Sequence, residues 1–193
     1  MTQDLSLYTE DYYTRDIAET WFWRNGLLRP DQLAAICYAF GLPFTGGEGL
    51  ARREPGYVVS VGAGRGELEA RLQALPGVTM VTGIDPSPGA AAMYEGARLI
   101  PGPGQHEAAR ADTVIFCESI EHIPAEQSLA LIAAMKPGAR LIITNWPDYH
   151  PLWPDPLNPW DHVTLISDDF YDALCEGRDV IVRKGSHLVL DIR

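Results

Sequence analysis

The chain has 193 residues, of which 46% are hydrophobic, so it can bury one substantial core, and its length favours a single domain. Its formal net charge of −11 argues against duplex nucleic acid as a partner, because duplex binding rests on lysine and arginine neutralising phosphates. We expect a reduced, cytoplasmic protein without a membrane partner, because the three cysteines are widely spaced, the N-terminus is polar, and no apolar run is long enough to span a membrane.

The N-terminal part of the sequence has the pattern of helices. Apolar residues recur at helical spacing up to about residue 43, and this predicts two or three helices. A glycine-rich loop follows at 43–49, and strands begin to alternate with helices near Tyr57. We therefore expect one domain in which a helical cap, residues 1–50, precedes a core at 51–193.

A glycine-rich turn follows the first strand of this core. The apolar run at 57–61 predicts a buried strand, and Gly62, Gly64 and Gly66 follow it, before leucines at helical spacing. Glycine lacks a Cβ atom, so the backbone can turn sharply and a ligand can lie against it. A dinucleotide fingerprint, G-x-G-x-x-G, would need its third glycine at Glu67, so this turn has the different spacing G-x-G-x-G.

Strands and helices alternate through the rest of the core. Further strands are predicted at 81–85, 97–100, 112–117 and 141–144, helices at 68–75, 90–97 and 124–135, and a loop at 101–107. Strands separated by helices imply parallel pairing, so we expect a doubly wound sheet with helices on both faces.

The C-terminal tail departs from this alternation. Two β-like segments, 179–185 and 186–193, follow each other with almost no linker, and Gly185 and Ser186 suit a two-residue hairpin turn. Such a hairpin would close a parallel sheet with one antiparallel strand.

Three features together resemble the class I S-adenosylmethionine-dependent methyltransferases over about residues 57–193: the G-x-G-x-G turn, the acidic residue that ends the second strand, and the motif after the fourth strand. The resemblance implies an α/β fold with a Rossmann-like, seven-stranded methyltransferase sheet, mostly parallel with a C-terminal antiparallel hairpin. It also implies S-adenosyl-L-methionine as cofactor. The hairpin and the glycine spacing count against the rival class, the nicotinamide oxidoreductases.

The resemblance also implies which residues bind the cofactor. Backbone N–H groups of the glycine turn and of the following helix N-terminus would contact its amino-acid portion. Asp85 would accept hydrogen bonds from both ribose hydroxyls, and Gln105 is the candidate adenine contact. The full expected set is Ser60, Gly62, Ala63, Gly64, Gly66, Asp85, Pro86, Gln105 and Glu118.

Ser60 departs from the family pattern. The family often has an acidic residue two positions before the first glycine, where this chain has a serine. A hydroxyl can form a hydrogen bond near the methionine moiety, but it cannot neutralise an ammonium charge. We therefore expect either weaker cofactor binding or another carboxylate in its place.

The segment CESIEHIP, residues 117–124, resembles the floor of the active site in this family. If Glu118 begins a helical turn, Glu121 and His122 lie three and four residues further on and share its face. Glu121, His122 and the later His162 are the candidate catalytic residues, as proton acceptors. The unperturbed pKa of an imidazole suits this role near neutral pH.

The E-x-x-E-H pattern, with His162, also resembles the metal-binding pattern of small-RNA 3′-terminal 2′-O-methyltransferases. That resemblance would make Glu118, Glu121, His122 and His162 ligands of manganese, iron or magnesium. Many metal-free class I methyltransferases carry a similar segment, and the acidity of the chain counts against RNA. A divalent metal is therefore an alternative that we do not favour.

A segment rich in proline and tryptophan, residues 145–162, follows the fifth strand. It has too many prolines for a helix or a central strand, and it leaves the carboxyl end of the sheet, where open α/β sheets bind ligands. It forms either an aromatic substrate wall or lid, or a hydrophobic cover packed on the N-terminal helices. The aromatic residues concerned are Trp146, Tyr149, His150, Trp153 and Trp160.

These patterns predict an S-adenosylmethionine-dependent methyltransferase that acts on an O or N acceptor of a small-molecule or nucleotide-like substrate. One alternative is a metal-dependent RNA 3′-terminal 2′-O-methyltransferase. Another is a non-catalytic, methyltransferase-like subunit that binds a partner protein. The acceptor atom and the oligomeric state stay open at this point.

Overall fold

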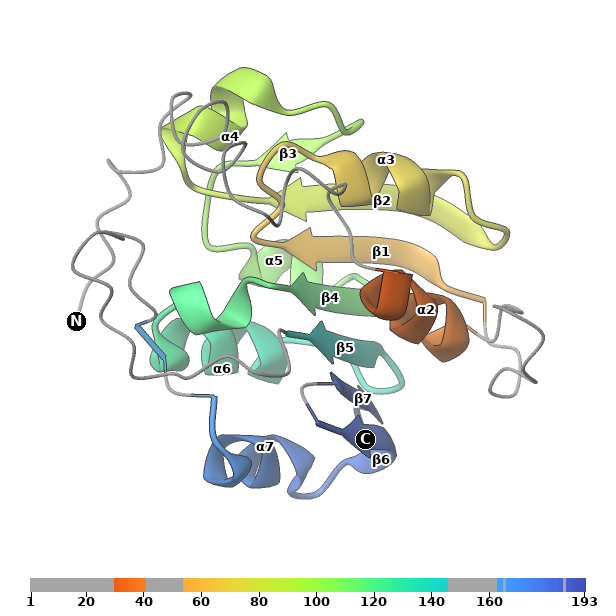
Figure 1. The fold of residues 1–193 in the computed structure, drawn as a ribbon, viewed down its shortest axis with the longest axis vertical. Coiled ribbons are helices and arrows are strands. Elements are labelled where there is room, and N and C mark those ends of the chain that lie inside the picture. The colour runs from red at the N-terminus through yellow and green to blue at the C-terminus, as the bar shows by residue number, and fades with distance from the viewer. Residues whose placement is uncertain (1–29, 41–53, 146–162, 165, 186) are drawn as a thin grey trace.

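The computed structural model describes residues 30–40, 54–145, 163–164, 166–185 and 187–193, and its strands form one sheet (Figure 1). The strands are β1 (Gly56–Val61), β2 (Val78–Ile84), β3 (Leu99–Ile100), β4 (Thr113–Cys117), β5 (Arg140–Thr144), β6 (Asp179–Lys184) and β7 (His187–Asp191). The helices are α2 (Pro30–Ala39), α3 (Glu67–Gln73), α4 (Pro88–Met93), α5 (Gln105–Ala108), α6 (Ala125–Ala133) and α7 (Asp168–Cys175), with a 3₁₀ helix η3 (Ile120–His122).

The sheet has the predicted topology. Its seven strands run in the order β3-β2-β1-β4-β5-β7-β6 within the described residues. Strands β1 to β5 pair in parallel, and β7 is antiparallel to both β5 and β6. Lys184 pairs with His187, so the hairpin loop has two residues, as predicted. The Rossmann-like sheet with a closing antiparallel hairpin is thereby confirmed.

The carboxyl ends of three neighbouring strands, β2, β1 and β4, lie level. Val61, the last residue of β1, pairs with Ile84 of β2 on one side and with Phe116 of β4 on the other. The segments that follow these strands therefore gather at one edge of the sheet, where open α/β folds bind ligands.

Helices cover both faces of the sheet because successive strand residues point to opposite sides. Val58 belongs to a buried cluster with Ile36 of α2 and Leu72 of α3. Val59, the next residue, belongs to a second cluster with residues of α5, α6 and α7, among them Leu131. The central strands are thus buried on both sides, and helices cover both faces of the sheet, as the sequence predicts.

Helix α2 is the part of the predicted N-terminal cap that the structure describes, and it is tied to the sheet. The buried guanidinium of Arg140 in β5 donates to the carbonyl oxygen of Ala39 at 2.5 Å and pairs with the carboxylate of Asp191 in β7 at 2.8 and 3.0 Å. Residues 1–29 and 41–50 lie outside the described part.

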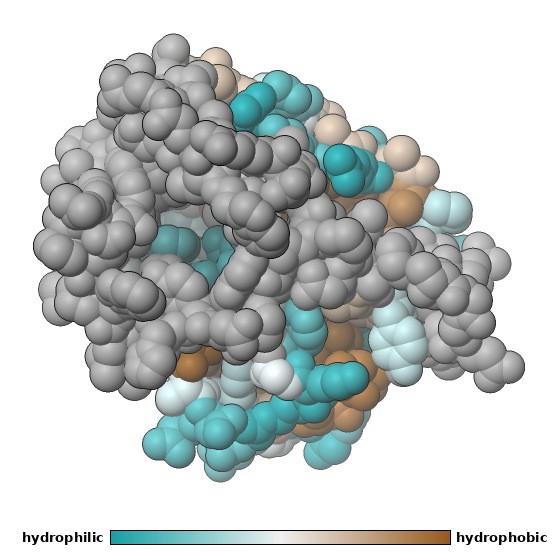
Figure 2. All heavy atoms as spheres, viewed as in Figure 1, coloured by the Kyte–Doolittle hydropathy of each residue, from teal (hydrophilic) through white to brown (hydrophobic). Residues whose placement is uncertain are grey.

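Helix α7 covers the sheet beside the C-terminal hairpin. Its Tyr171 and Leu174 are buried, whereas Asp168 and Asp172 are exposed and pair with Arg183 of β6. Hydrophilic side chains accordingly gather over this helix at the bottom of Figure 2. None of the helices in the described ranges is both long and apolar enough to cross a membrane.

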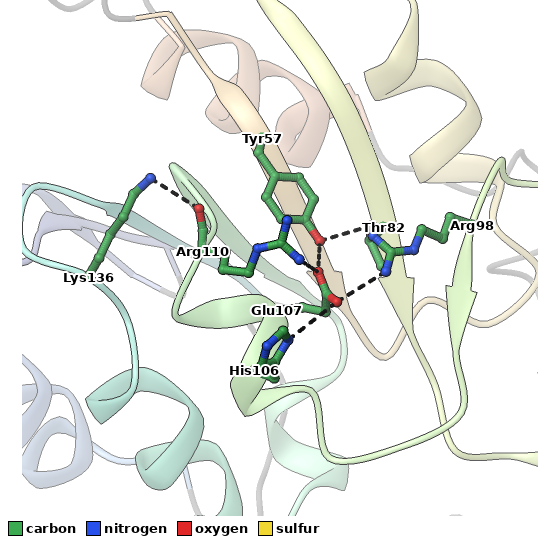
Figure 3. A network of polar contacts seen from close by, with 7 residues as sticks. All are labelled: Tyr57, Thr82, Arg98, His106, Glu107, Arg110 and Lys136. Atoms are coloured by element: carbon green, nitrogen blue, oxygen red, sulfur yellow. Dashed lines mark hydrogen bonds and ion pairs between the residues drawn. The ribbon is translucent and has the colours of Figure 1, made fainter.

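The segment predicted as a loop at 101–107 contains a helical turn, so that prediction is wrong for residues 105–107. Figure 3 shows the reason: helix α5 points Glu107 inward, where the Tyr57 hydroxyl donates to its carboxylate. Arg98 pairs with the same carboxylate at 3.1 Å and Arg110 at 3.9 Å. A buried carboxylate is tolerated when such partners satisfy it, and this tertiary network selects the helical turn.

Candidate active site

The glycine turn after β1 needs glycine at its first and last positions. Gly62, Gly64 and Gly66 have φ values of +74°, +52° and +86°, in the left-handed region that favours glycine. A Cβ atom on Gly62 would lie 2.4 Å from the Cβ of Ser119, and one on Gly66 would lie 2.6 Å from the backbone nitrogen of Gly96. The turn is therefore packed against the segments that follow β4 and α4.

Asp85 joins this turn to the end of β2. Its Oδ2 accepts a hydrogen bond from the backbone N–H of Gly64 at 2.8 Å, and its Oδ1 accepts one from the N–H of Ser87 at 2.9 Å. The Ser87 hydroxyl in turn caps α4 by accepting from Ala90. Asp85 is only 7% exposed. A carboxylate has about four lone-pair positions, and the described residues use two of those on Asp85, which leaves two for a ligand.

The N–H groups of the turn are largely used within the chain. Those of Gly62 and Ala63 donate to the carbonyl oxygen of Ile84 at 2.8 and 3.2 Å, and that of Gly66 donates to Ala63 at 3.0 Å. The N–H of Gly64 donates to Asp85. Contact between these N–H groups and the cofactor, as the resemblance implied, would compete with these bonds.

The remaining predicted cofactor residues on this side differ in exposure. Pro86, next to Asp85, is exposed, and Gln105 is half-buried at the start of α5. A Cβ atom on Gly104, just before it, would lie 2.2 Å from Ile84 Cδ1. This close packing brings the start of α5 to the carboxyl end of β2, on the same edge as the glycine turn.

The helical turn after β4 begins later than predicted. Glu118 has φ +50° and η3 begins at Ile120, so Glu118 does not begin the helical turn, and the condition under which it would share a face with Glu121 and His122 is not met. The Ser119 hydroxyl donates to the carbonyl oxygen of Val61 at 2.6 Å. This bond ties the segment to the end of β1, and the backbone reverses at Glu118 before the helical turn starts.

Burial reverses the proton affinities expected for Glu121 and His122. Glu121 is 3% exposed, and burial raises the pKa of its carboxyl to about 7. Burial also lowers the pKa of the His122 imidazole to about 4. Within the described residues, Glu121 Oε2 has no hydrogen-bond partner. Near neutral pH the carboxylate can take up a proton, while the imidazole stays neutral.

The residues that the metal-dependent alternative names as ligands do not form a metal site on the described part of the chain. There, no three His, Cys, Asp or Glu side chains come together in a way that could hold a metal ion. Glu118, Glu121 and His122 all lie in that part. The fourth residue, His162, and the aromatic residues at 146–160 lie outside the described residues.

Sequence reasoning missed one buried carboxylate at this edge, that of Glu69 in α3, which is 1% exposed. Its position contained a signal: Glu69 lies three residues before the buried Leu72, and residues three apart share a helix face. An acidic residue on the apolar face of a helix is rarely buried unless it is paired with another group.

Replacing Glu121 with glutamine is expected to stabilise the protein, and more so at pH 8 than at pH 5. Because the pKa of Glu121 is raised, the folded chain holds the proton more tightly than the unfolded chain, and stability is lost as the pH rises through about 7. Glutamine cannot ionise, so its advantage in the free energy of unfolding should grow by about 1–3 kcal/mol between these pH values.

Urea denaturation at pH 5 and pH 8 measures this difference. Glu126→Gln, a change of the same kind at an exposed position of α6, serves as the control and should show little pH-dependent difference. An advantage of Glu121→Gln that is equal at both pH values would contradict the prediction.

Comparisons with known proteins agree with the fold. A family model described as a methyltransferase domain matches residues 35–180. The magnesium protoporphyrin IX methyltransferase ChlM from Synechocystis PCC 6803, solved with bound SAH, is similar over 98% of this chain and 100% of its own, with 19% identity and a TM-score of 0.57. The N-methyltransferase NodS from Bradyrhizobium japonicum WM9 is similar over 91% of this chain and 99% of its own, with 14% identity and a TM-score of 0.53. These two likenesses show the fold alone, and no curated protein matches the chain.

Proposed function

The chain belongs to the methyltransferase domain family, and we propose that it transfers a methyl group from S-adenosylmethionine to an O or N acceptor of a small-molecule or nucleotide-like substrate. The observation that carries this proposal is the glycine turn at the carboxyl edge of β1, joined to β2 through Asp85. A turn of this kind, beside an acidic residue at the next strand end, suits a ligand with a ribose and a charged tail.

The residues present fit such a cofactor. Asp85 keeps two acceptor positions open, which suits the two hydroxyls of a ribose. Gln105 lies half-buried at the neighbouring strand end, with an amide that can both donate and accept toward a base. Ser60, Gly62, Ala63, Gly64, Gly66, Pro86 and Glu118 complete the proposed binding set.

When bound, S-adenosylmethionine supplies an electrophilic methyl group on a positively charged sulfur. The chain's main task is then alignment, and holding an acceptor in line can lower the barrier by roughly 7–11 kcal/mol. A protonated acceptor also needs a base. Glu121, with its pKa raised to about 7, is better suited to this than His122, whose pKa near 4 makes it a weaker base. His162 stays a third proposed proton acceptor.

Isothermal titration calorimetry with S-adenosylmethionine, its demethylated product and NAD tests the proposal. We expect the first two ligands to bind with dissociation constants below about 1 mM and NAD not to bind. Binding of NAD alone would favour an oxidoreductase. Binding of none of the three would contradict the proposal and favour a non-catalytic interaction subunit.

A further inference from the structure

The carboxylate of Glu69 is buried with little hydrogen bonding to support it. Glu69 is 1% exposed, and neither of its two carboxylate oxygens has a partner at normal hydrogen-bond geometry on the described part of the chain. Burying an unpaired carboxylate costs several kcal/mol in general, so such a group either holds a proton or binds a cation. Burial raises the pKa of Glu69 to about 7, so both states are accessible near neutral pH.

Glu69 lies at the ligand-binding edge of the sheet. The Ser60 side chain of β1 faces its carboxylate and partly offsets the rise of the Glu69 pKa. The charge of Asp85, just after β2, acts on Glu69, and the charge of Glu69 acts on Cys117, the last residue of β4. Ser60, Asp85 and Cys117 lie at or next to the carboxyl ends of β1, β2 and β4, the edge at which the glycine turn follows β1.

The groups around Glu69 give the site an excess of negative charge. Glu67 on the same helix and Asp85 both raise the pKa of Glu69 by repulsion, and within the described residues no Lys or Arg is among the main influences on this pKa. Tyr94, after α4, also faces it, since the Glu69 charge contributes to the raised pKa of the Tyr94 hydroxyl. That hydroxyl is buried and has no partner at normal hydrogen-bond geometry among the described residues. These groups therefore offer acceptors to a ligand that donates.

We propose that Glu69 binds the α-ammonium group of S-adenosylmethionine and so supplies the carboxylate that Ser60 cannot. The inference rests on the proposed function. An ammonium group has three donors and no acceptor, so it needs oxygen atoms rather than the N–H groups of the turn, which are already used within the chain. Glu69 provides the charge, and the Ser60 hydroxyl provides a second acceptor beside it.

The proposal has a pH signature. A bound ammonium favours the ionised form of Glu69, so ligand binding near pH 7 releases about half a proton from this carboxyl. Affinity for a ligand with an ammonium group should consequently increase as the pH rises from 6 to 8. A ligand without that group should show neither effect.

Titration calorimetry of two ligands tests this. S-adenosylhomocysteine carries the ammonium group, and 5′-deoxy-5′-methylthioadenosine lacks the whole amino-acid portion. In Glu69→Gln we expect affinity for S-adenosylhomocysteine to fall about 10- to 100-fold, as for a lost hydrogen bond to a charged group, while affinity for methylthioadenosine is unchanged. Titrations in two buffers of different ionisation enthalpy should show proton release by the wild type and none by the variant.

Glu67→Gln is the matched control, because Glu67 lies in the same helical turn and pairs with Arg65 at 3.5 Å. It should change the affinity for S-adenosylhomocysteine far less than Glu69→Gln does, because it leaves the Glu69 carboxylate in place. An unchanged affinity in Glu69→Gln, an equal loss for both ligands, or an equal loss in Glu67→Gln would overturn the inference. If the wild type binds neither ligand, the proposed function itself fails, whereas wild-type binding of both with no effect of Glu69→Gln removes this inference alone.

Discussion

Replacing Asp85 with alanine is expected to weaken binding of S-adenosylhomocysteine by about 100- to 10,000-fold while the protein stays folded. The carboxylate would accept two hydrogen bonds from the ribose, and each bond to a charged group contributes about 1.5–3 kcal/mol. The same carboxylate holds the N–H groups of Gly64 and Ser87, so its loss also loosens the glycine turn. Titration calorimetry measures the affinity, and urea denaturation measures the stability.

Asp112→Ala is the control for this experiment, because Asp112 has a similar structural role at the opposite end of β1. Its Oδ2 accepts from the backbone N–H of Tyr57 at 2.8 Å, and its Oδ1 pairs with Lys136 at 2.6 Å. Removing it should lower the stability without changing ligand affinity. If Asp85→Ala binds the ligand as tightly as the wild type, the ribose role is wrong. An equal loss of affinity in both variants would mean that Asp85 acts only through stability.

Local pattern was sufficient to predict the fold because each central strand is a nearly continuous apolar run, as expected for a strand covered on both faces, and strands separated by helices pair in parallel. Val58 and Val59 are adjacent, and they belong to the two different clusters on the two faces of the sheet. The hairpin could also be predicted from the sequence, because a two-residue turn fixes the register of the two strands that it joins. Glycine spacing placed the turn at Gly62 to Gly66, where the left-handed backbone needs glycine.

The details of the site depend on contacts between distant residues, and no local pattern carries them. The bond from the Ser119 hydroxyl to Val61 joins residues 58 apart, and it sets where the helical turn after Glu118 begins. Burial is equally non-local. His122 is the obvious base from unperturbed pKa values, yet burial lowers its pKa and raises that of Glu121. Glu69 was missed because a helical pattern shows on which side of the helix a residue lies, but not which residues pack against that side.

Replacing Gly62 with alanine is expected to lower the free energy of unfolding by about 2–5 kcal/mol. The left-handed backbone, φ +74°, costs an alanine about 1–2 kcal/mol, and overpacking a tight contact costs about 1–3 kcal/mol more. The contact here is the Cβ of Ser119, 2.4 Å from the new methyl group. A Cβ atom cannot rotate away, so Ser119 has to shift, and its bond to Val61 is then strained or lost.

Gly138→Ala separates the two parts of this cost. Gly138 has nearly the same backbone conformation, φ +81°, but a Cβ there would meet nothing within 4 Å. Urea denaturation should therefore show only the conformational cost, about 1–2 kcal/mol, for Gly138→Ala. The excess in Gly62→Ala measures the close approach between the glycine turn and the segment after β4. This close approach joins the glycine turn to the segment that contains Glu118, Glu121 and His122. We therefore also expect Gly62→Ala, but not Gly138→Ala, to weaken binding of S-adenosylhomocysteine. Equal losses of stability in the two variants would show that the glycine turn and this segment can move apart without lowering the free energy of unfolding. In that case Ser119 does not hold the glycine turn in place.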